Sequence, residues 1–319
     1  MLALLQHLAD MPKSQALPYL AQALTCLAKA PDFRPATTDA SLQALSEVLH
    51  RCAAKRHVCS SQARAAVPAL SSLMQSTSCP AAGLLGAFAA WDLSEMPEMQ
   101  AAITNGALPA VVALLQDLRR PAGQSLAAMC LGLASRNPRA RAPIAGAVLP
   151  CLVAMLPAGD IDGLPAIIVQ VRAAALHVLS VLTLVDDHHG AVLNEALPAL
   201  VSIIQQNRRP GSDCRYRAAC VLQHLAASKN LWVEQNVADA ALSGLVQLML
   251  NTSDRRECLM AVEAVSALAA SPDVKVQHQV HAVAYFPLMV QAQQKTDIES
   301  RRAAKRALAR LQPSCCVMM

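Results

Sequence analysis

The sequence predicts an all-α solenoid built from about seven helical repeats. Three observations favour this fold class. A short phrase recurs in near-copies along the 319 residues, apolar residues follow most copies at helical spacing, and the composition is 54% hydrophobic but only 3% aromatic and 15% charged. This composition excludes a disordered chain, and so few aromatic residues argue against a β-propeller or an aromatic surface that stacks on nucleic acid.

The recurring phrase marks one helix of each repeat. Its copies are ALPYL (16–20), AVPAL (66–70), ALPAV (107–111), VLPCL (148–152), ALPAL (196–200), ALSGL (241–245) and YFPLM (285–289). Successive copies are 41 to 50 residues apart, which is the range of solenoid repeats with two or three helices. Six copies carry proline as their third residue. Proline suits the first turn of a helix, so each phrase predicts a helix start.

A second, alanine-rich helix follows a polar break in each repeat. These helices are expected at 41–49, 89–95, 126–135, 174–182, 218–228, 261–271 and 303–311. Small residues every three or four positions let helices approach closely, so a core forms without aromatic side chains. A short polar-then-apolar run, such as residues 137–147, precedes the next phrase. This run predicts a third, shorter helix.

These features resemble the armadillo repeat family. The match consists of a short first helix, a Gly-Ala-Leu-Pro-type second helix and an Ala-x-x-x-Leu-Ser-type third helix, with NGALPAVVALLQ (105–116) as the best copy. The resemblance covers residues 1–311 and implies a right-handed α-solenoid of about seven armadillo-type repeats, followed by a flexible tail at 312–319. HEAT repeats stay an alternative for the first repeat. Members of the family share a scaffold and not a chemistry.

The resemblance also implies a binding groove lined by the third helices. Importin-alpha-like members hold an extended basic peptide with a Trp and an Asn four residues later, on one helix face. Only Trp91 matches the Trp here, and no repeat has the Asn, which argues against a nuclear-import receptor. The groove residues expected instead are Glu47, Trp91, Glu95, His177, His224 and Glu263.

Charge along this groove runs from acidic at the first repeats to basic at the last. Glu47 and Glu95 lie at one end, and Arg306 and Arg310 at the other. A partner is therefore expected to be basic where it meets the first two repeats. The alternative is a solvated face that needs no partner, with Trp91 packed within its own repeat.

The net charge of +5 comes entirely from the C-terminal end. Residues 301–319 contain five basic side chains and no acidic one, so residues 1–300 carry 22 charges of each sign. The five are Arg301, Arg302, Lys305, Arg306 and Arg310. They lie on a predicted helix from Ile298 to Leu311. One face of this helix is expected to pack on the last repeat and the other to be solvent-exposed, as in a terminal capping helix.

The last four residues have the form of a prenylation box. Cys316 is followed by Val317, Met318 and Met319, and a final Met favours farnesyl. Cys315 is a candidate for palmitoylation. One lipid chain binds membranes weakly, so the five basic residues are expected to face an anionic membrane as a second signal. The alternative is a frayed, unmodified tail.

No motif predicts catalysis, a cofactor, a metal site or a small-molecule substrate. Cys220 and His224 share a helix face but occupy repeat positions, His188 and His189 are expected in a solvated turn, and the basic pairs, such as Arg255-Arg256, are expected in turns. Nucleic acid is not an expected partner.

The cellular location is predicted from three features of the sequence. It has eleven cysteines without a CxxC pair, no signal peptide and no apolar membrane span. These features predict a cytoplasmic chain, peripheral to a membrane if lipidated, or a nuclear one.

The sequence therefore predicts a non-enzymatic protein-interaction scaffold or adaptor that binds an extended segment in its groove and is tethered by a prenylated C-terminus. A soluble structural subunit, or an importin-alpha-like transport adaptor with an unmodified tail, is the alternative. A third reading is the substrate-recruiting part of a larger complex such as a ubiquitin ligase.

Overall fold

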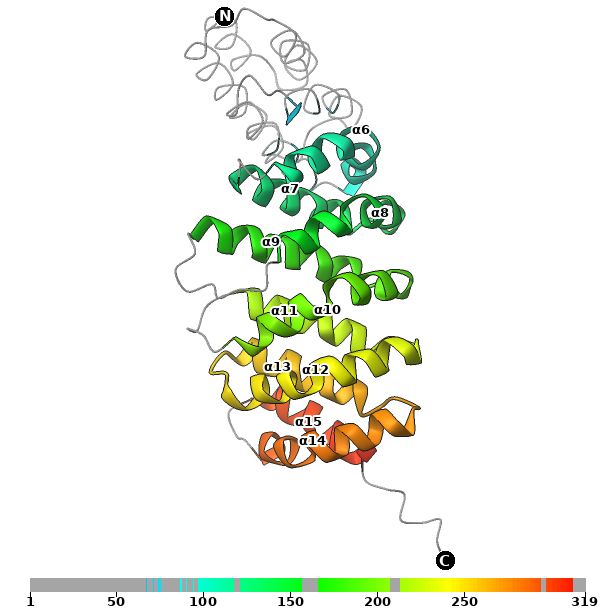
Figure 1. Cartoon of the computed structure of the whole chain (residues 1–319), viewed down its shortest axis with the longest axis vertical. Coiled ribbons are helices and arrows are strands. Elements are labelled where there is room, and N and C mark those ends of the chain that lie inside the picture. Colours follow the sequence, from blue (N-terminus) through cyan, green and yellow to red (C-terminus); the bar gives the residue numbers. More distant parts are fainter. Residues whose placement is uncertain are drawn as a thin grey trace, which may run out of the picture. The chain divides into compact units, whose positions relative to one another are not determined.

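A computed structural model describes residues 97–117, 121–156, 166–206, 213–293 and 297–311, together with the single positions 67, 71, 74, 75, 87, 90 and 94. Throughout this part of the chain the regular structure is helical and contains no strand (Figure 1). The all-α prediction is therefore confirmed. The first two repeats and the tail lie largely or wholly outside the described residues, so the repeat count and the 1–311 boundary stay predictions.

The chain forms two compact units, Met1–Cys151 and Leu152–Met319. In the first unit, α6 (Pro97–Gln116) packs against α7 (Pro121–Ala134). The next helix, α8 (Pro138–Ala154), begins in this unit and ends just beyond the boundary.

Two sets of helices alternate along the second unit. The third helices of the repeats are α9 (Ala166–Leu182), α11 (Asp213–Ala226), α13 (Arg255–Leu268) and α15 (Ile298–Leu311). The longer helices between them are α10 (His189–Gln205), α12 (Leu231–Asn251) and α14 (Val274–Gln293), with a short 3-10 turn, η1 (Asp186–His188), before α10. Within each set, every helix packs against the next, so the unit has two layers (Figure 1).

The predicted alanine-rich helices are present in the described repeats, but four of them begin about five to eight residues earlier than expected. Residues assigned to the preceding break form the first turn or two of each helix; they are mostly polar in α11 and α13 and mostly apolar in α9. In α13, for example, the Asp254 side chain accepts a hydrogen bond from the Arg256 backbone N–H and caps the helix at Arg255. The bounds of α15 agree with the prediction, Ile298 to Leu311.

The prediction that each proline starts a helix is wrong. Pro109, Pro150, Pro198 and Pro287 all lie inside continuous helices, because the short first helix and the second helix of a repeat run together. An interior proline removes one backbone hydrogen bond and bends a helix. The phrase therefore marks a position within a long helix rather than its beginning.

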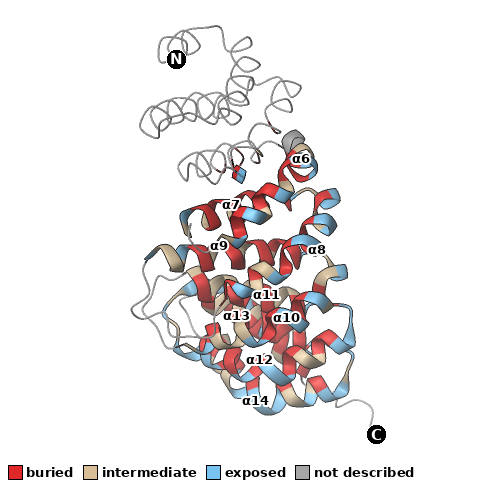
Figure 2. Cartoon of the chain, turned by 45° about the horizontal axis from the view of Figure 1, so that its top comes forward, coloured by how far each residue is buried: buried red, intermediate tan, exposed pale blue. Residues whose placement is uncertain are grey.

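Alanine and leucine ladders form the contacts between third helices. Ala175, Ala218, Ala261 and Ala304 recur every 43 residues and are fully buried. Leu182, Leu225, Leu268 and Leu311 recur at the same step and are also buried. Figure 2 shows such buried positions in red along the helices of this unit. Alanine at these buried positions lets the helices approach closely, as expected, and the leucines add to the core.

Candidate functional site

The candidate site is the exposed side of the third helices in the second unit, here called the third-helix face. Because the repeat step is 43 residues, equivalent side chains line up across α9, α11, α13 and α15. The expected Trp positions are occupied by His177, Cys220, Glu263 and Arg306, and the expected Asn positions by Val181, His224, Ala267 and Arg310. All of them except Val181 are at least partly exposed. In the first unit, the equivalents on α7 are Ala128 and Gly132, both buried.

Two predicted site residues contact each other on this face. Arg306 Nη2 donates to Glu263 Oε1 at 2.8 Å, and the side chains are 52% and 33% exposed. An ion pair this exposed adds little stability. The structure thus joins a residue expected in the groove to one expected to face a membrane.

The other basic residues of α15 divide into two groups. Arg310 Nη1 donates to the Ser266 carbonyl oxygen on α13 at 3.2 Å, so its guanidinium is held but its charge is not neutralised. Arg302 and Lys305 are exposed and Arg301 is half-buried. These three form no ion pair with any residue in the described ranges. Arg302 and Arg310 make the third-helix face positively charged at α15, whereas Lys305 occupies a position whose equivalents Val262, Ala219 and Leu176 are fully buried and lies at the end of the stack.

His224 is held between α9 and α11. Its Nδ1 lies 3.1 Å from Thr183 Oγ1, at the end of α9. Burial lowers the pKa of His224, with a smaller opposing effect from the Ser180 backbone. His177 on α9 occupies one of the expected Trp positions; it is half-buried and also interacts with other residues.

Cys220 and His224 do not have the electrostatics of a reactive thiol site. Burial raises the pKa of the Cys220 thiol, although a hydrogen bond with Tyr216 and the charges of Arg217 and Arg256 oppose this effect. A nucleophilic cysteine needs a lowered thiol pKa beside a basic histidine. Both shifts here run in the other direction.

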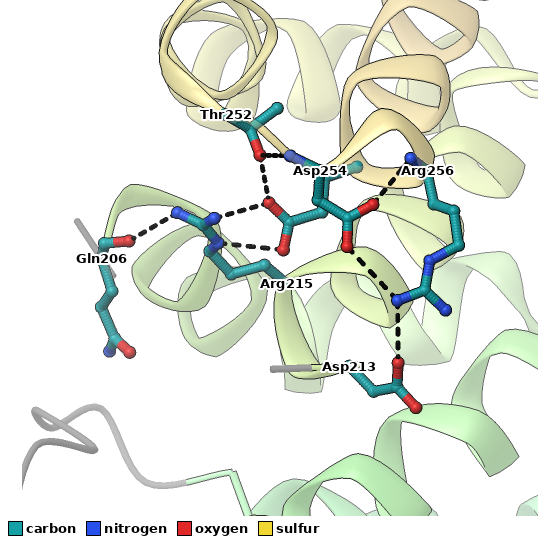
Figure 3. Close-up of polar contacts among 7 residues, drawn as sticks. Gln206, Asp213, Arg215, Thr252, Asp254 and Arg256 are labelled. Carbon is teal, nitrogen blue, oxygen red and sulfur yellow. Dashed lines mark hydrogen bonds and ion pairs between the residues drawn. The ribbon is translucent and has the colours of Figure 1, made fainter. Parts of the chain in front are cut away.

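Tyr216 and Arg256 form a contact on this face that the sequence interpretation missed. The Arg256 guanidinium carbon lies 5.0 Å from the centre of the Tyr216 ring, a cation–π arrangement. Arg256 also forms ion pairs with Asp254 and with Asp213 of the preceding repeat, each at 3.3 Å (Figure 3). The 43-residue step from Asp213 to Arg256 was the available signal, since equivalent positions in neighbouring repeats face each other.

A buried polar network ties α11 to α13 beside this contact. Arg215 donates to both carboxylate oxygens of Glu257, at 3.1 and 2.6 Å, and to the Gln206 carbonyl oxygen at 3.3 Å (Figure 3). Thr252 Oγ1 donates to the same carboxylate at 2.6 Å. A cavity of about 140 Å³ lies next to the network and is lined in part by Arg215, Gln206 and Thr252. Because the two charges neutralise each other, this network is structural.

The expectation of a solvated turn is wrong for His189, whereas Arg255 and Arg256 begin α13 and are 64% and 57% exposed, as a solvated site requires. His189 is only 3% exposed and begins α10; its Nε2 lies 2.8 Å from the Thr183 carbonyl oxygen and its Nδ1 lies 3.5 Å from Asp186 Oδ1. Arg255 forms an ion pair with Asp297 at 2.9 Å, and Arg256 is held as described above. For Arg255 and Arg256 the partners Asp297 and Asp213 come from the neighbouring repeats, which a local sequence pattern does not reveal.

Several predicted residues lie outside the described part of the chain: Glu47, Trp91, Glu95, Cys315 and Cys316. Within the described part, no group of three or more His, Cys, Asp or Glu side chains is arranged to hold a metal ion. None of the described helices is both long enough and apolar enough to cross a membrane.

No protein-family model and no curated protein matches the sequence. Solved structures do match. The match to one engineered protein covers 96% of this chain and 72% of that protein, with 20% identity and a TM-score of 0.73. The match to another engineered protein covers 77% of this chain and 98% of that protein, with 24% identity and a TM-score of 0.66. The match to a computationally designed armadillo repeat protein for modular peptide recognition covers 76% of this chain and 99% of that protein, with 19% identity and a TM-score of 0.66. The chain therefore has an armadillo-type α-solenoid fold.

Proposed function

We propose that this armadillo-type solenoid is a non-enzymatic scaffold that binds a protein partner, and that an extended segment of the partner lies across the third-helix face. One observation carries the proposal: successive third helices present partly exposed side chains at a constant 43-residue step. Peptide recognition by a designed protein of the same fold supports it.

An extended segment matches the spacing of this face. Packed helices lie about 8–10 Å apart, and an extended chain advances about 3.3 Å per residue. About three residues of the partner therefore pass each third helix. The same positions of the scaffold then meet equivalent positions of the segment at every repeat.

The contacts to the segment come from side chains other than a row of asparagine carboxamides. The expected Asn positions in the second unit carry Val181, His224, Ala267 and Arg310, and none of these has the carboxamide group that both donates to and accepts from a peptide backbone. Tyr216 and Glu263 are the prominent half-buried side chains on α11 and α13. Tyrosine is among the side chains that most often dominate binding energy.

A peptide-display selection on the full chain tests this proposal. Enriched peptides are expected to bind about tenfold more weakly to a Tyr216→Ala variant. The matched control replaces the exposed α12 residues Ser243 and Gln247 with alanine and is expected to leave the affinity unchanged. Thermal melts of each variant exclude loss of folding. If no peptide is enriched, or if the control weakens binding as much, the proposal is wrong.

A lipid tether at the cytoplasmic face of a membrane is a second part of the proposal. Its support is the Cys-Val-Met-Met terminus and the adjoining basic residues of α15. Expression of Cys316→Ser and Cys315→Ser variants in cells, followed by membrane fractionation, tests it. Cys316→Ser is expected to move the chain to the soluble fraction, and unchanged partitioning contradicts the tether.

A further inference from the structure

We infer that the partner segment is acidic where it meets α15 and uncharged where it crosses α11 and α9. This inference rests on the proposed function and adds the charge pattern of the partner. It also differs from the sequence-based expectation, which specified only a basic partner at the first two repeats.

Positive charge on the third-helix face is concentrated at α15. Exposed Arg302 and Arg310 keep their charges, while Arg306 is matched by Glu263. Glu299 is the single acidic residue in this helix. A segment that places carboxylates here gains charge-assisted contacts, while a basic segment is repelled.

The equivalent positions on α11 and α9 carry no acidic or permanently charged side chain. One repeat step back from Arg302, Arg306 and Arg310, α13 has Leu259, Glu263 and Ala267. Two and three steps back, the side chains are Tyr216, Cys220 and His224 on α11, and Ala173, His177 and Val181 on α9. These two helices therefore favour uncharged residues of the segment.

Glu263 separates the two regions. Its carboxylate points to Arg306 at 2.8 Å, and it repels acidic residues that shift onto α13. This carboxylate fixes the register of the segment, so that its acidic residues stop at α15. Since α11 and α15 are two helix spacings apart, about six residues separate the acidic residues from those over α11.

An anionic lipid surface offers the same negative charge, but the contacts of α15 favour a peptide. Arg306 and Arg310 both reach back to α13, to Glu263 and to the Ser266 carbonyl oxygen. The guanidinium groups of these two arginines therefore lie along the third-helix face, on the path of an extended segment. The two sources of negative charge are separated by the experiment below.

The experiment compares random-peptide selections on three full-length proteins made in bacteria, where the cysteines acquire no lipid. They are the wild type, a charge reversal on the face, Arg302→Glu with Arg310→Glu, and a matched reversal at exposed positions elsewhere, Lys229→Glu with Lys275→Glu. Peptides from the wild type and the matched control are expected to cluster acidic residues at one end. The face variant is expected to lose this bias and to bind those peptides about tenfold more weakly.

Three results overturn the inference in distinguishable ways. Enriched peptides without an acidic end leave the proposed function standing and remove the charge pattern. No enriched peptide on any of the proteins removes both. The third result concerns lipid vesicles. If the wild type sediments with phosphatidylserine-containing vesicles but not with pure phosphatidylcholine vesicles, and the face variant loses this sedimentation while it keeps its peptide affinity, these basic residues bind a membrane.

Discussion

At the scale of single residues, buried and exposed ion pairs in the same repeats have different roles. Glu257 is 1% exposed and accepts hydrogen bonds from Arg215 and Thr252, whereas Glu263 is one-third exposed and pairs only with Arg306 among the described residues. Removing one partner of a buried pair leaves the other charge without compensation. Removing an exposed partner leaves a charge that water solvates.

We therefore expect Glu257→Ala to lower the free energy of unfolding by about 3 kcal/mol or more, and Glu263→Ala by less than about 1 kcal/mol. Urea denaturation followed by circular dichroism measures both. A double variant, Arg215→Met with Glu257→Leu, should recover much of the loss because it removes both charges. Equal effects of the two single variants contradict this assignment of roles.

His224 makes stability depend on pH. Its pKa in the folded chain lies below the ordinary 6.5, chiefly because of burial. The unfolded chain therefore takes up a proton first as the pH falls. The stabilisation is present above about pH 6.5 and is lost as the pH falls through the folded pKa.

Acidification from about pH 7 to about pH 5 is thus expected to lower the melting temperature. His224→Gln, which cannot take up this proton, should show a smaller decrease over the same range. Melting curves of the two proteins at matched ionic strength provide the measurement. An identical slope for both proteins would show that His224 does not contribute.

At the scale of helices, α12 and α10 approach closely at a glycine. A Cβ atom on Gly244 would lie 2.9 Å from Ile204 Cδ1 and 3.3 Å from Gln205 Cγ. Gly190 in α10 is different, because the nearest atom to its added Cβ belongs to Trp232 at 4.0 Å. Of these two positions, only the first would force a neighbouring side chain to shift if glycine were replaced.

Alanine at these two glycines should therefore have different effects. Gly190→Ala is expected to stabilise the chain by up to about 0.5 kcal/mol through helix propensity, since Gly190 lies in the first turn of α10. Gly244→Ala is expected to lose that gain, and adding Ile204→Val, which removes Cδ1, should restore part of it. A double-mutant cycle in urea measures the coupling. Additive effects of Gly244→Ala and Ile204→Val contradict the close contact.

The helices show which parts of the fold a sequence pattern predicts. The alanine and leucine periodicity located the third helices, because it reflects burial against neighbours at every repeat, and it placed α15 correctly from Ile298 to Leu311. Proline was interpreted by its local preference, and Pro198 and Pro287 instead lie within long helices. Packing along both halves of these helices outweighs the one lost hydrogen bond at each proline.

At the scale of the whole molecule, the candidate site was predictable as a set of positions but not as a set of contacts. The repeat step alone placed His177, Glu263 and Arg306 in one row. It did not show that Glu263 pairs with Arg306 or that Arg256 covers Tyr216. Those contacts depend on side-chain reach between neighbouring repeats, so they appear only once the helices are packed.

The central claim is that an extended segment of a protein partner crosses the third-helix face one repeat after another. The most direct measurement places benzoylphenylalanine, one site at a time, at positions 177, 220 and 263 of the full chain and maps cross-links to an enriched peptide by mass spectrometry. Position 243, exposed on α12, is the control. We expect the cross-linked residue to advance by about three along the peptide from each third helix to the next. Cross-links from all three positions to one peptide residue, or cross-links from position 243 instead, would contradict the claim.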